Sequence, residues 1–276
     1  MTMKNINIAT IDFVPMSNAQ RYLHRYRSLD GKAASFVEAT VCRNELYFAR
    51  PSSFNDPFDC RPSFSMEAPK ARLRKYYEGV YSRQAPSMSR AVRRAESKSI
   101  ARDPLRSPSH PDNLRDFKAT YHASVTEKIG LLCLSEVPDD LLMWSHYADS
   151  HRGVCLVFDW QAPFFAEAQA VTYQKRRPCI NPILQSRDEM LDNALLTKSD
   201  HWRYEKEWRV FQYKQGFGKY SFPPSTLVGI ILGAQISEAN RAMVHGWLVG
   251  RGSPIAVFQT ALSDAEFTVT FEPCLG

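Results

Sequence analysis

Four segments of the chain are richer in polar, aromatic and turn-forming residues than the packing of a core requires. Their side chains include carboxylates, imidazoles and guanidinium groups, which are the groups that move protons and hold anionic substrates. We therefore expect a functional site to draw on these segments. They are 22–27 (YLHRYR), 54–59 (FNDPFD), 133–153 (with MWSHYA and HRGV) and 202–209 (WRYEKEWR).

The order of these segments resembles a bacterial family of domains of unknown function, the one numbered 2971. The shared pattern is a Tyr-Arg/Lys-Tyr-Arg start, a Phe-Asn-Asp-Pro-Phe turn, a Met-Trp-x-His-Tyr-Ala…His-x-Gly-Val block and a Glu-Lys-Glu-Trp-Arg block. It extends from about Tyr22 to Gly233, which is most of the chain. The family has no settled activity, so the resemblance leaves the reaction to be argued.

A basic residue, then a serine at a strand end, then a Glu-x-Glu pair looks like the arginine–serine–glutamate triad of ADP-ribosyltransferases. The resemblance places Arg25 on the first core strand, Ser135 at the end of the strand 131–135, and Glu205 and Glu207 as the paired acids. It implies an α+β fold with a mixed or antiparallel split sheet, NAD as the substrate and no metal.

The resemblance also implies a role for each of these residues. NAD cleavage passes through an oxocarbenium-like sugar, as glycoside cleavage does. Glu207 would hold the ribose 2′-hydroxyl and oppose the positive charge. Glu205, expected on the same strand face, would deprotonate the acceptor. Arg25 would hold phosphate or ribose oxygens, and Ser135 would steady the arginine or the carboxylate.

The sequence departs from the transferase pattern at two points. It has Cys-Leu-Ser where that fold has Ser-x-Ser, and the basic residue could be His24, Arg25 or Arg27. Tyr147 or Trp144 would stack on the nicotinamide ring. The residues expected to bind the cofactor are His24, Tyr26, Asn55, Asp56, Trp144, His146 and Tyr147. By resemblance alone, such a protein would be a bacterial toxin or an anti-phage defence effector.

A metal-dependent nuclease is the first alternative, with Asp56, Asp59, His146 and His151 as ligands. The two histidines lie five residues apart, however, and ligands on one helix face are four apart. Asn-Asp-Pro is also an ordinary turn sequence. The paired glutamates have a structural interpretation too, as ion-pair partners of Arg203 or Arg209.

The basic charge of the chain lies in one segment. The net charge is +6, and residues 67–128 alone carry fourteen Lys and Arg against seven Asp and Glu. Tyrosines lie between the basic residues, which suggests phosphate contacts together with stacking on unpaired bases. A non-catalytic nucleic-acid-binding module is the second alternative, and an acidic protein is the alternative partner. The residues expected at this surface are Arg72, Arg74, Lys75, Arg90, Arg93 and Arg94.

Composition and missing motifs exclude several classes of protein. With 276 residues, 44% hydrophobic and 23% charged, the chain is globular. Six dispersed cysteines without a CxxC pair argue against zinc or a disulfide framework. The chain has no apolar run long enough for a membrane span and no secretory signal in 1–15, so we expect a cytoplasmic protein without a membrane partner. P-loop, dinucleotide-fold and serine-hydrolase motifs are absent.

Hydrophobic periodicity predicts a single α+β domain over 1–276, with a basic helical insertion at 67–128. We expect insertion helices near 68–83, 87–102 and 112–126. Elsewhere, strands are expected at 46–49, 129–135, 153–160, 168–173, 207–213, 228–232, 255–262 and 267–272, and helices at 32–42, 139–149, 187–198 and 237–250.

Overall fold

The computed structural model describes residues 22–103 and 106–274, which form two compact units. The first, the sheet unit, comprises 22–49, 130–171 and 201–274. The second, the helical unit, comprises 50–103, 106–129 and 172–200. The segment 1–15, on which the expected lack of a secretory signal rests, lies outside the described residues.

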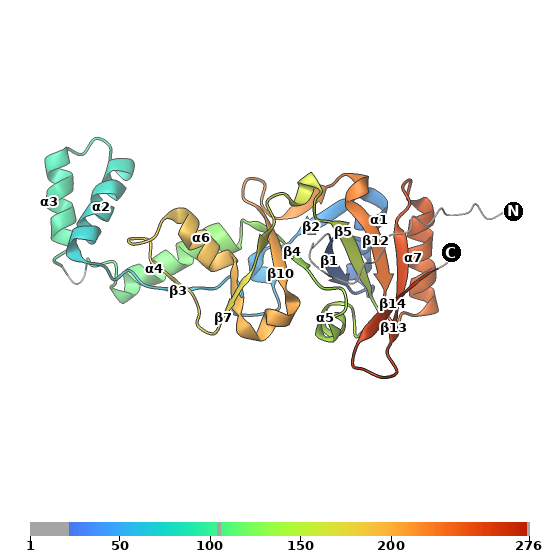
Figure 1. Cartoon of the computed structure of the whole chain (residues 1–276). Coiled ribbons are helices and arrows are strands. Elements are labelled where there is room, and N and C mark those ends of the chain that lie inside the picture. The colour runs from blue at the N-terminus through green and yellow to red at the C-terminus, as the bar shows by residue number, and fades with distance from the viewer. Residues whose placement is uncertain (1–21, 104–105, 275–276) are drawn as a thin grey trace. The chain divides into compact units, whose positions relative to one another are not determined.

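The sheet unit is built on a mixed sheet of eight strands (Figure 1). Within it, β12 and β13 run parallel and the other neighbouring pairs are antiparallel. The α+β class and the mixed sheet are thereby confirmed, whereas the split sheet of an ADP-ribosyltransferase is not. In order across the sheet, the strands are β14 (Val269–Pro273), β13 (Ala256–Leu262), β12 (Leu227–Leu232), β5 (Val154–Asp159), β1 (Tyr22–Arg27), β4 (Gly130–Ser135), β10 (Glu207–Gln212) and β6 (Gln169–Ala170).

Each face of this sheet is covered by helices. Successive residues of a strand point to opposite faces of the sheet, so the side chains of one strand pack into two different cores. On β1, Leu23 joins the core formed with α1 (Lys32–Arg43) and α7 (Glu238–Gly250), and Tyr26 joins the core formed with α5 (Leu141–Tyr147). The start of α7 is capped, because the Ser237 hydroxyl accepts a hydrogen bond from the Asn240 amide at 3.2 Å.

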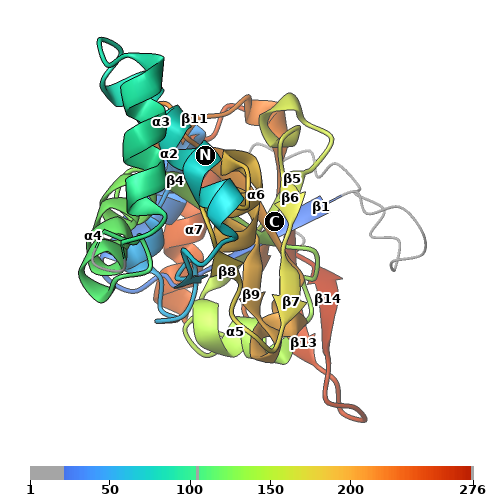
Figure 2. The same cartoon turned by 90° about the vertical axis from the view of Figure 1, so that its left-hand side faces the viewer.

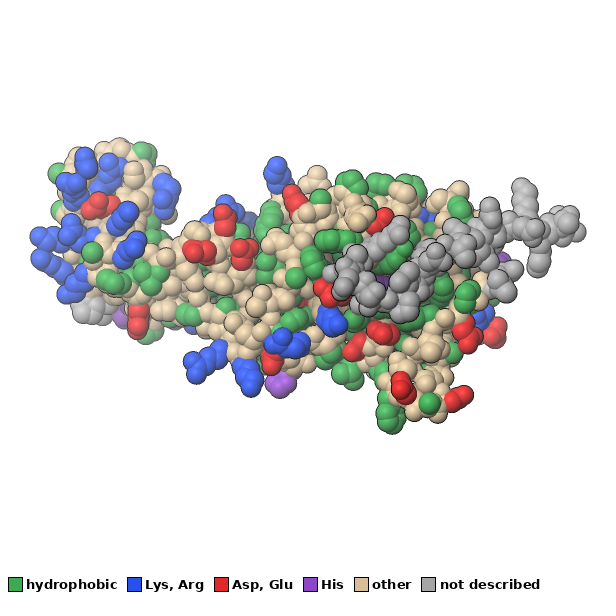
Figure 3. All heavy atoms as spheres, in the orientation of Figure 1, with side chains coloured by type: hydrophobic (Ala, Val, Ile, Leu, Met, Phe, Trp, Pro, Cys, Tyr) green, Lys and Arg blue, Asp and Glu red, His purple; other side chains and the backbone are tan. Residues whose placement is uncertain are grey.

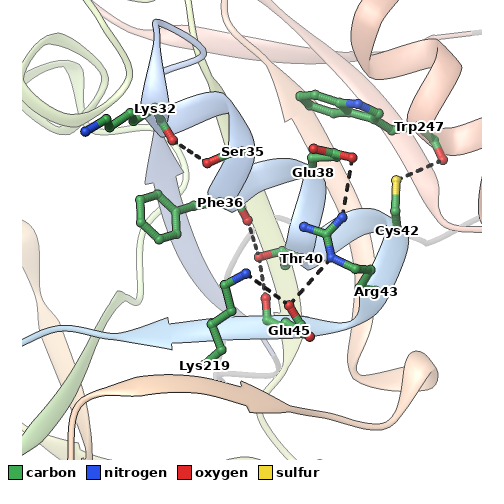
Figure 4. Close-up of polar contacts among 10 residues, drawn as sticks. All are labelled: Lys32, Ser35, Phe36, Glu38, Thr40, Cys42, Arg43, Glu45, Lys219 and Trp247. Atoms are coloured by element: carbon green, nitrogen blue, oxygen red, sulfur yellow. Dashed lines mark hydrogen bonds and ion pairs between the residues drawn. The ribbon is translucent and has the colours of Figure 1, made fainter.

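A second, two-stranded sheet of the same unit joins β2 (Glu45–Phe48) to β11 (Gly218–Ser221). Figure 4 shows how α1 is tied to β2. The Thr40 hydroxyl lies 2.8 Å from the Glu45 carbonyl, and the Glu45 carboxylate lies 3.6 Å from both Arg43 and Lys219. Such exposed ion pairs contribute ~1 kcal/mol at most to the free energy of unfolding. They therefore orient α1 against β2 more than they stabilise the fold. Short 3₁₀ turns complete the unit: η3 (Pro163–Phe165), η4 (Asp200–Glu205, which begins in the helical unit) and η5 (Pro224–Thr226).

The helical unit contains the three helices expected in the basic segment. Leu73 of α2 packs with Met66 and Ile183, so the segment shares a core with chain on both sides of it. That the whole chain forms one domain stays a prediction. The elements are η1 (Pro51–Ser53), α2 (Lys70–Gln84), α3 (Arg90–Ile100), α4 (Pro111–Tyr121), the π-helix η2 (His122–Thr126), α6 (Arg187–Leu195), and the strand pairs β3 (Ser63–Phe64) with β8 (Cys179–Ile180) and β7 (Thr172–Gln174) with β9 (Thr197–Ser199).

None of the helices in the described ranges has the length and apolar character needed to cross a membrane.

Candidate active site

Three of the four segments singled out in the sequence meet on adjacent strands of the large sheet. His24 on β1 is paired directly with Ser135 on β4, and Ser135 is paired directly with Glu207 on β10. Directly opposite residues of neighbouring strands project from the same face. The three side chains therefore form a row across β1, β4 and β10, which we call the polar row.

His24 supplies the imidazole of the polar row, and at neutral pH this imidazole is uncharged. Its ring is 3% exposed, and burial lowers its pKa from 6.5 to about 4. Nδ1 lies 3.3 Å from the Ser135 carbonyl oxygen. Because that oxygen accepts hydrogen bonds, Nδ1 carries the proton, and Nε2 is left as an acceptor. Nε2 is buried and has no hydrogen-bond partner among residues 22–103 and 106–274.

Ser135 fixes the backbone around the row. Its hydroxyl donates to the Glu205 carbonyl oxygen at 2.6 Å and accepts from the Val137 amide at 3.1 Å. The Tyr26 hydroxyl donates to the Val137 carbonyl oxygen at 2.7 Å. Ser135 and Tyr26 thus act through backbone, holding the end of β4 against the segment that carries the two acids.

The two glutamates are held by different elements, so the expectation that they share one strand face is wrong. Glu205 ends η4, and Lys206 between them has a left-handed backbone with φ of 41°. This break in the strand gives Glu205 its own environment. It is 3% exposed, and its Oε1 accepts a hydrogen bond from the Tyr147 hydroxyl at 2.7 Å.

Glu207 is buried and paired with an arginine on its own strand. Arg209 Nε lies 2.7 Å from Glu207 Oε1, and a terminal nitrogen of the same guanidinium lies 3.0 Å from Oε2. Arg209 is fully buried. A planar donor fork fixes both carboxylate oxygens and favours the charged form. From the sequence, Arg209 is expected only as a structural ion-pair partner of the glutamates. The spacing of two residues between Glu207 and Arg209 was the sequence signal for this pair, because it places both side chains on one face of a strand.

Arg25, the basic residue preferred from the sequence, is not part of the polar row. It follows His24 directly, so its side chain leaves the opposite face of β1. Its guanidinium donates to the Cys133 carbonyl oxygen at 3.0 Å and to the Tyr47 carbonyl oxygen at 3.4 Å. Arg27, two residues further on, lies on the same face as Arg25. The structure therefore places the alternative residue, His24, in line with Ser135 and Glu207.

Trp144 is a core residue, which corrects the expectation that it stacks on a ligand. The ring is fully buried, its Nε1 donates to the Pro138 carbonyl oxygen at 2.8 Å, and Tyr26 packs on it edge-to-face at 5.1 Å. His151 stacks on the same ring at 6.1 Å. No exposed ring face remains for nicotinamide.

His146 lies on the surface of α5, away from the polar contacts of Ser135. It is exposed, and its ring lies 6.2 Å from Trp202 and 6.4 Å from Tyr204. Tyr147, its neighbour, is the residue of α5 that reaches the acids, through its hydroxyl on Glu205.

The predicted Asn55, Asp56 and Asp59 belong to the helical unit. Asp56 Oδ1 accepts from the Phe58 amide at 2.8 Å, which confirms the turn interpretation of this segment. Asp59 forms a buried ion pair with Lys198 at 3.7 Å. No cluster of three or more His, Cys, Asp or Glu suited to a metal occurs in the described part of the chain.

One glycine of the sequence motif has a clear structural reason. A side chain at Gly153 would overlap the Arg27 carbonyl oxygen of the neighbouring strand. The Gly153 amide also donates to the Ala148 carbonyl oxygen at 2.7 Å. The His-x-Gly-Val part of the motif therefore allows the turn after α5 to approach β1 closely.

Fold and site together define an α+β protein with a buried row of histidine, serine and glutamate across β1, β4 and β10 of a mixed sheet. The row places a neutral imidazole, a hydroxyl that holds backbone and a carboxylate on one face of the sheet. Residues 143–210, from α5 to β10, match the model of the family described as Protein of unknown function (DUF2971). This match confirms the family resemblance seen in the sequence. No curated protein and no solved structure matches the chain.

Proposed function

We propose that the protein is an ADP-ribosyltransferase-like enzyme that cleaves NAD and modifies a nucleic acid or a protein. The observation that carries the proposal is the polar row: His24, Ser135 and Glu207 come from distant parts of the chain and meet in register on β1, β4 and β10. A basic group, a serine and an acid in this order are what the transferase triad requires. His24 takes the place first assigned to Arg25.

The contacts of Glu207 suit the cleavage step. In that step the bond between nicotinamide and the ribose breaks, and nicotinamide leaves with the bonding electrons. The sugar becomes positively charged, and a fixed carboxylate opposes that charge. Arg209 holds both oxygens of Glu207 in one orientation, so the charge is in place before the reaction.

The groups next to Glu207 suit the binding of NAD and the transfer of its ADP-ribose part to the acceptor. His24 Nε2, an acceptor, takes a hydrogen bond from a ribose hydroxyl of NAD. Glu205 takes the proton from the acceptor oxygen or nitrogen as that atom attacks the sugar. Tyr147 orients Glu205 through the hydrogen bond at 2.7 Å. Ser135 is a positioning residue in this scheme, because its hydroxyl holds backbone.

The biological setting follows from the resemblance to transferases. We propose a bacterial toxin or an anti-phage defence effector, acting in the cytoplasm where NAD is found. The target is a macromolecule, and the reaction needs no metal.

The test measures release of nicotinamide and transfer of label from NAD labelled in its adenylate part. The full chain is incubated with nucleic acids and with a protein extract as acceptors. We expect turnover by the native chain and its loss in Glu207→Gln. Glu38→Gln is the matched control, since Glu38 is an exposed carboxylate of α1 paired with Arg43 (Figure 4).

Two further variants separate the candidate basic residues. His24→Gln should lose turnover, whereas Arg25→Lys should keep it per folded molecule, as judged by circular dichroism and thermal melting. Absence of NAD turnover in the native chain with every acceptor refutes the proposal. Loss of turnover in a folded Arg25→Lys chain, with His24→Gln active, refutes the assignment of His24.

A further inference from the structure

Helices α2 and α3 of the helical unit form a two-helix hairpin, which Figure 2 shows side by side. We call residues 70–100 the basic hairpin. Its two helices are joined across their interface by a hydrogen bond from Arg93 to the Ser82 hydroxyl at 3.1 Å. The second helix starts at a proper cap, because the Ser89 hydroxyl accepts from the Val92 amide at 3.3 Å. The packing of α2 against α3 therefore determines which side chains of the hairpin face outward.

The charge of this hairpin is almost entirely positive. Its two helices carry nine Lys and Arg against two Glu. All nine except Arg93 are exposed. Figure 3 shows Lys and Arg side chains gathered over the part of the surface that α2 and α3 form. None of the nine forms an ion pair within residues 22–103 and 106–274, and Glu96 is paired instead with Arg106 beyond α3 at 2.9 Å. The nine are Lys70, Arg72, Arg74, Lys75, Arg83, Arg90, Arg93, Arg94 and Lys98.

The spacing of these cations costs stability. Arg90, Arg94 and Lys98 follow one another four residues apart, so they lie in a line along one face of α3. Lys70 and Arg74 have the same spacing on α2. Like charges four apart destabilise a helix by roughly 0.2–0.5 kcal/mol per pair. A bound polyanion removes this repulsion and gains from counterion release.

The tyrosines of α2 are partly buried by packing, and stacking of their rings on bases stays a prediction. Tyr76 and Tyr77 meet edge-to-face at 5.3 Å, and Tyr77 and Tyr81 lie 6.4 Å apart. Tyr76 and Tyr77 pack against the core of Met66 and Leu73. Burial raises the pKa of both phenols. The most exposed groups of this surface are thus guanidinium and ammonium groups, while the tyrosine rings are only partly exposed.

We propose that the basic hairpin binds the phosphate backbone of double-helical nucleic acid, without reading its sequence. A duplex presents one phosphate charge per ~1.7 Å of its axis. Exposed, unpaired cations beside rings that are only partly exposed suit this row of phosphates better than they suit unpaired bases. The basic hairpin contains no residue of the polar row, so duplex binding can be measured independently of NAD turnover.

The test measures binding of the full chain to a fluorescent duplex of about 20 base pairs over a range of salt. The variant Arg90→Gln/Arg94→Gln/Lys98→Gln removes one line of cations from an exposed helix face. Its matched control, Lys175→Gln/Arg176→Gln/Lys214→Gln, removes the same charge from exposed positions outside the hairpin.

We expect the slope of log K against log salt to fall by about three in the hairpin variant. Affinity at about 0.1 M salt should fall roughly 10²-fold, while the control variant stays close to the native chain. Equal loss in both triple variants overturns the proposal, because binding then follows net charge alone. So does tighter binding of a single strand than of the duplex, which indicates base stacking. Polyglutamate that competes with the duplex at equal charge concentration points to an acidic protein partner and also overturns it.

Discussion

His24 should make the stability of the sheet unit depend on pH. Burial lowers the pKa of its imidazole from 6.5 to about 4. The unfolded chain therefore takes up a proton on His24 between these two values, while the folded chain does not. Proton uptake by the unfolded state stabilises that state as the pH falls. The contribution of a neutral His24 is complete above pH 6.5 and is lost progressively down to about pH 4.

The size of this effect follows from the shift. One pKa unit corresponds to about 1.4 kcal/mol, so the full effect is roughly 3 kcal/mol. Between about pH 7.5 and about pH 5, the free energy of unfolding should fall by ~2 kcal/mol through His24 alone. His24→Gln removes this titration, so its stability should change less with pH by that amount.

Urea unfolding followed by tryptophan fluorescence measures this directly. All five tryptophans of the chain lie in the sheet unit, so the signal reports that unit. The control is His201→Gln, at an exposed position. We expect the pH dependence of this control to equal that of the native chain. If His24→Gln and the native chain lose the same stability on acidification, the imidazole is not a buried neutral group, and the acceptor role of Nε2 is refuted.

Three further perturbations test how the site is held together. Arg209→Met leaves the buried carboxylate of Glu207 without its fork and should cost about 3–5 kcal/mol of unfolding free energy in urea, and the double variant with Glu207→Gln should recover part of this loss. Ser135→Ala removes the buried hydrogen bonds of this hydroxyl with the Glu205 carbonyl oxygen and the Val137 amide. It should cost about 1–3 kcal/mol in the same assay, and a cost near zero would show that the hydroxyl does not hold this backbone. Gly153→Ala forces a methyl group into the backbone of β1 and should cost about 3 kcal/mol, seen as a lower midpoint in thermal melting, and an unchanged midpoint would contradict the close approach.

The sequence predicted the elements well because the signals are local. The apolar run that became β5 and the periodic pattern that became α7 depend on residues close to one another in the chain. Asp56 similarly forms the turn that its sequence predicts. The order of basic residue, serine and acid also predicted which segments come together, since those segments carry polar residues where packing needs none.

The parts of the site that could not be predicted depend on register and on backbone conformation. Whether His24 or Arg25 faces Ser135 depends on a one-residue choice of pairing between strands, because a slip by one residue exchanges the faces. The left-handed backbone at Lys206 separates Glu205 from the strand face of Glu207, and lysine carries no signal for it. Trp144 belongs to the core because of long-range packing, which residue type alone does not reveal.

The path of the chain through the two units has a practical consequence. The sheet unit is interrupted twice, at 50–129 and at 172–200, so shortening the chain from either end never isolates it. The first interruption, however, starts and finishes at neighbouring points. The amide of Ala49 donates to the carbonyl oxygen of Leu131, and the reverse bond is also formed, both at 2.8 Å. A short turn could therefore replace the whole of 50–129 without stretching the sheet. The polar row could then be studied without the basic hairpin, in a chain where Ile183 no longer packs on Leu73 and Lys198 no longer pairs with Asp59.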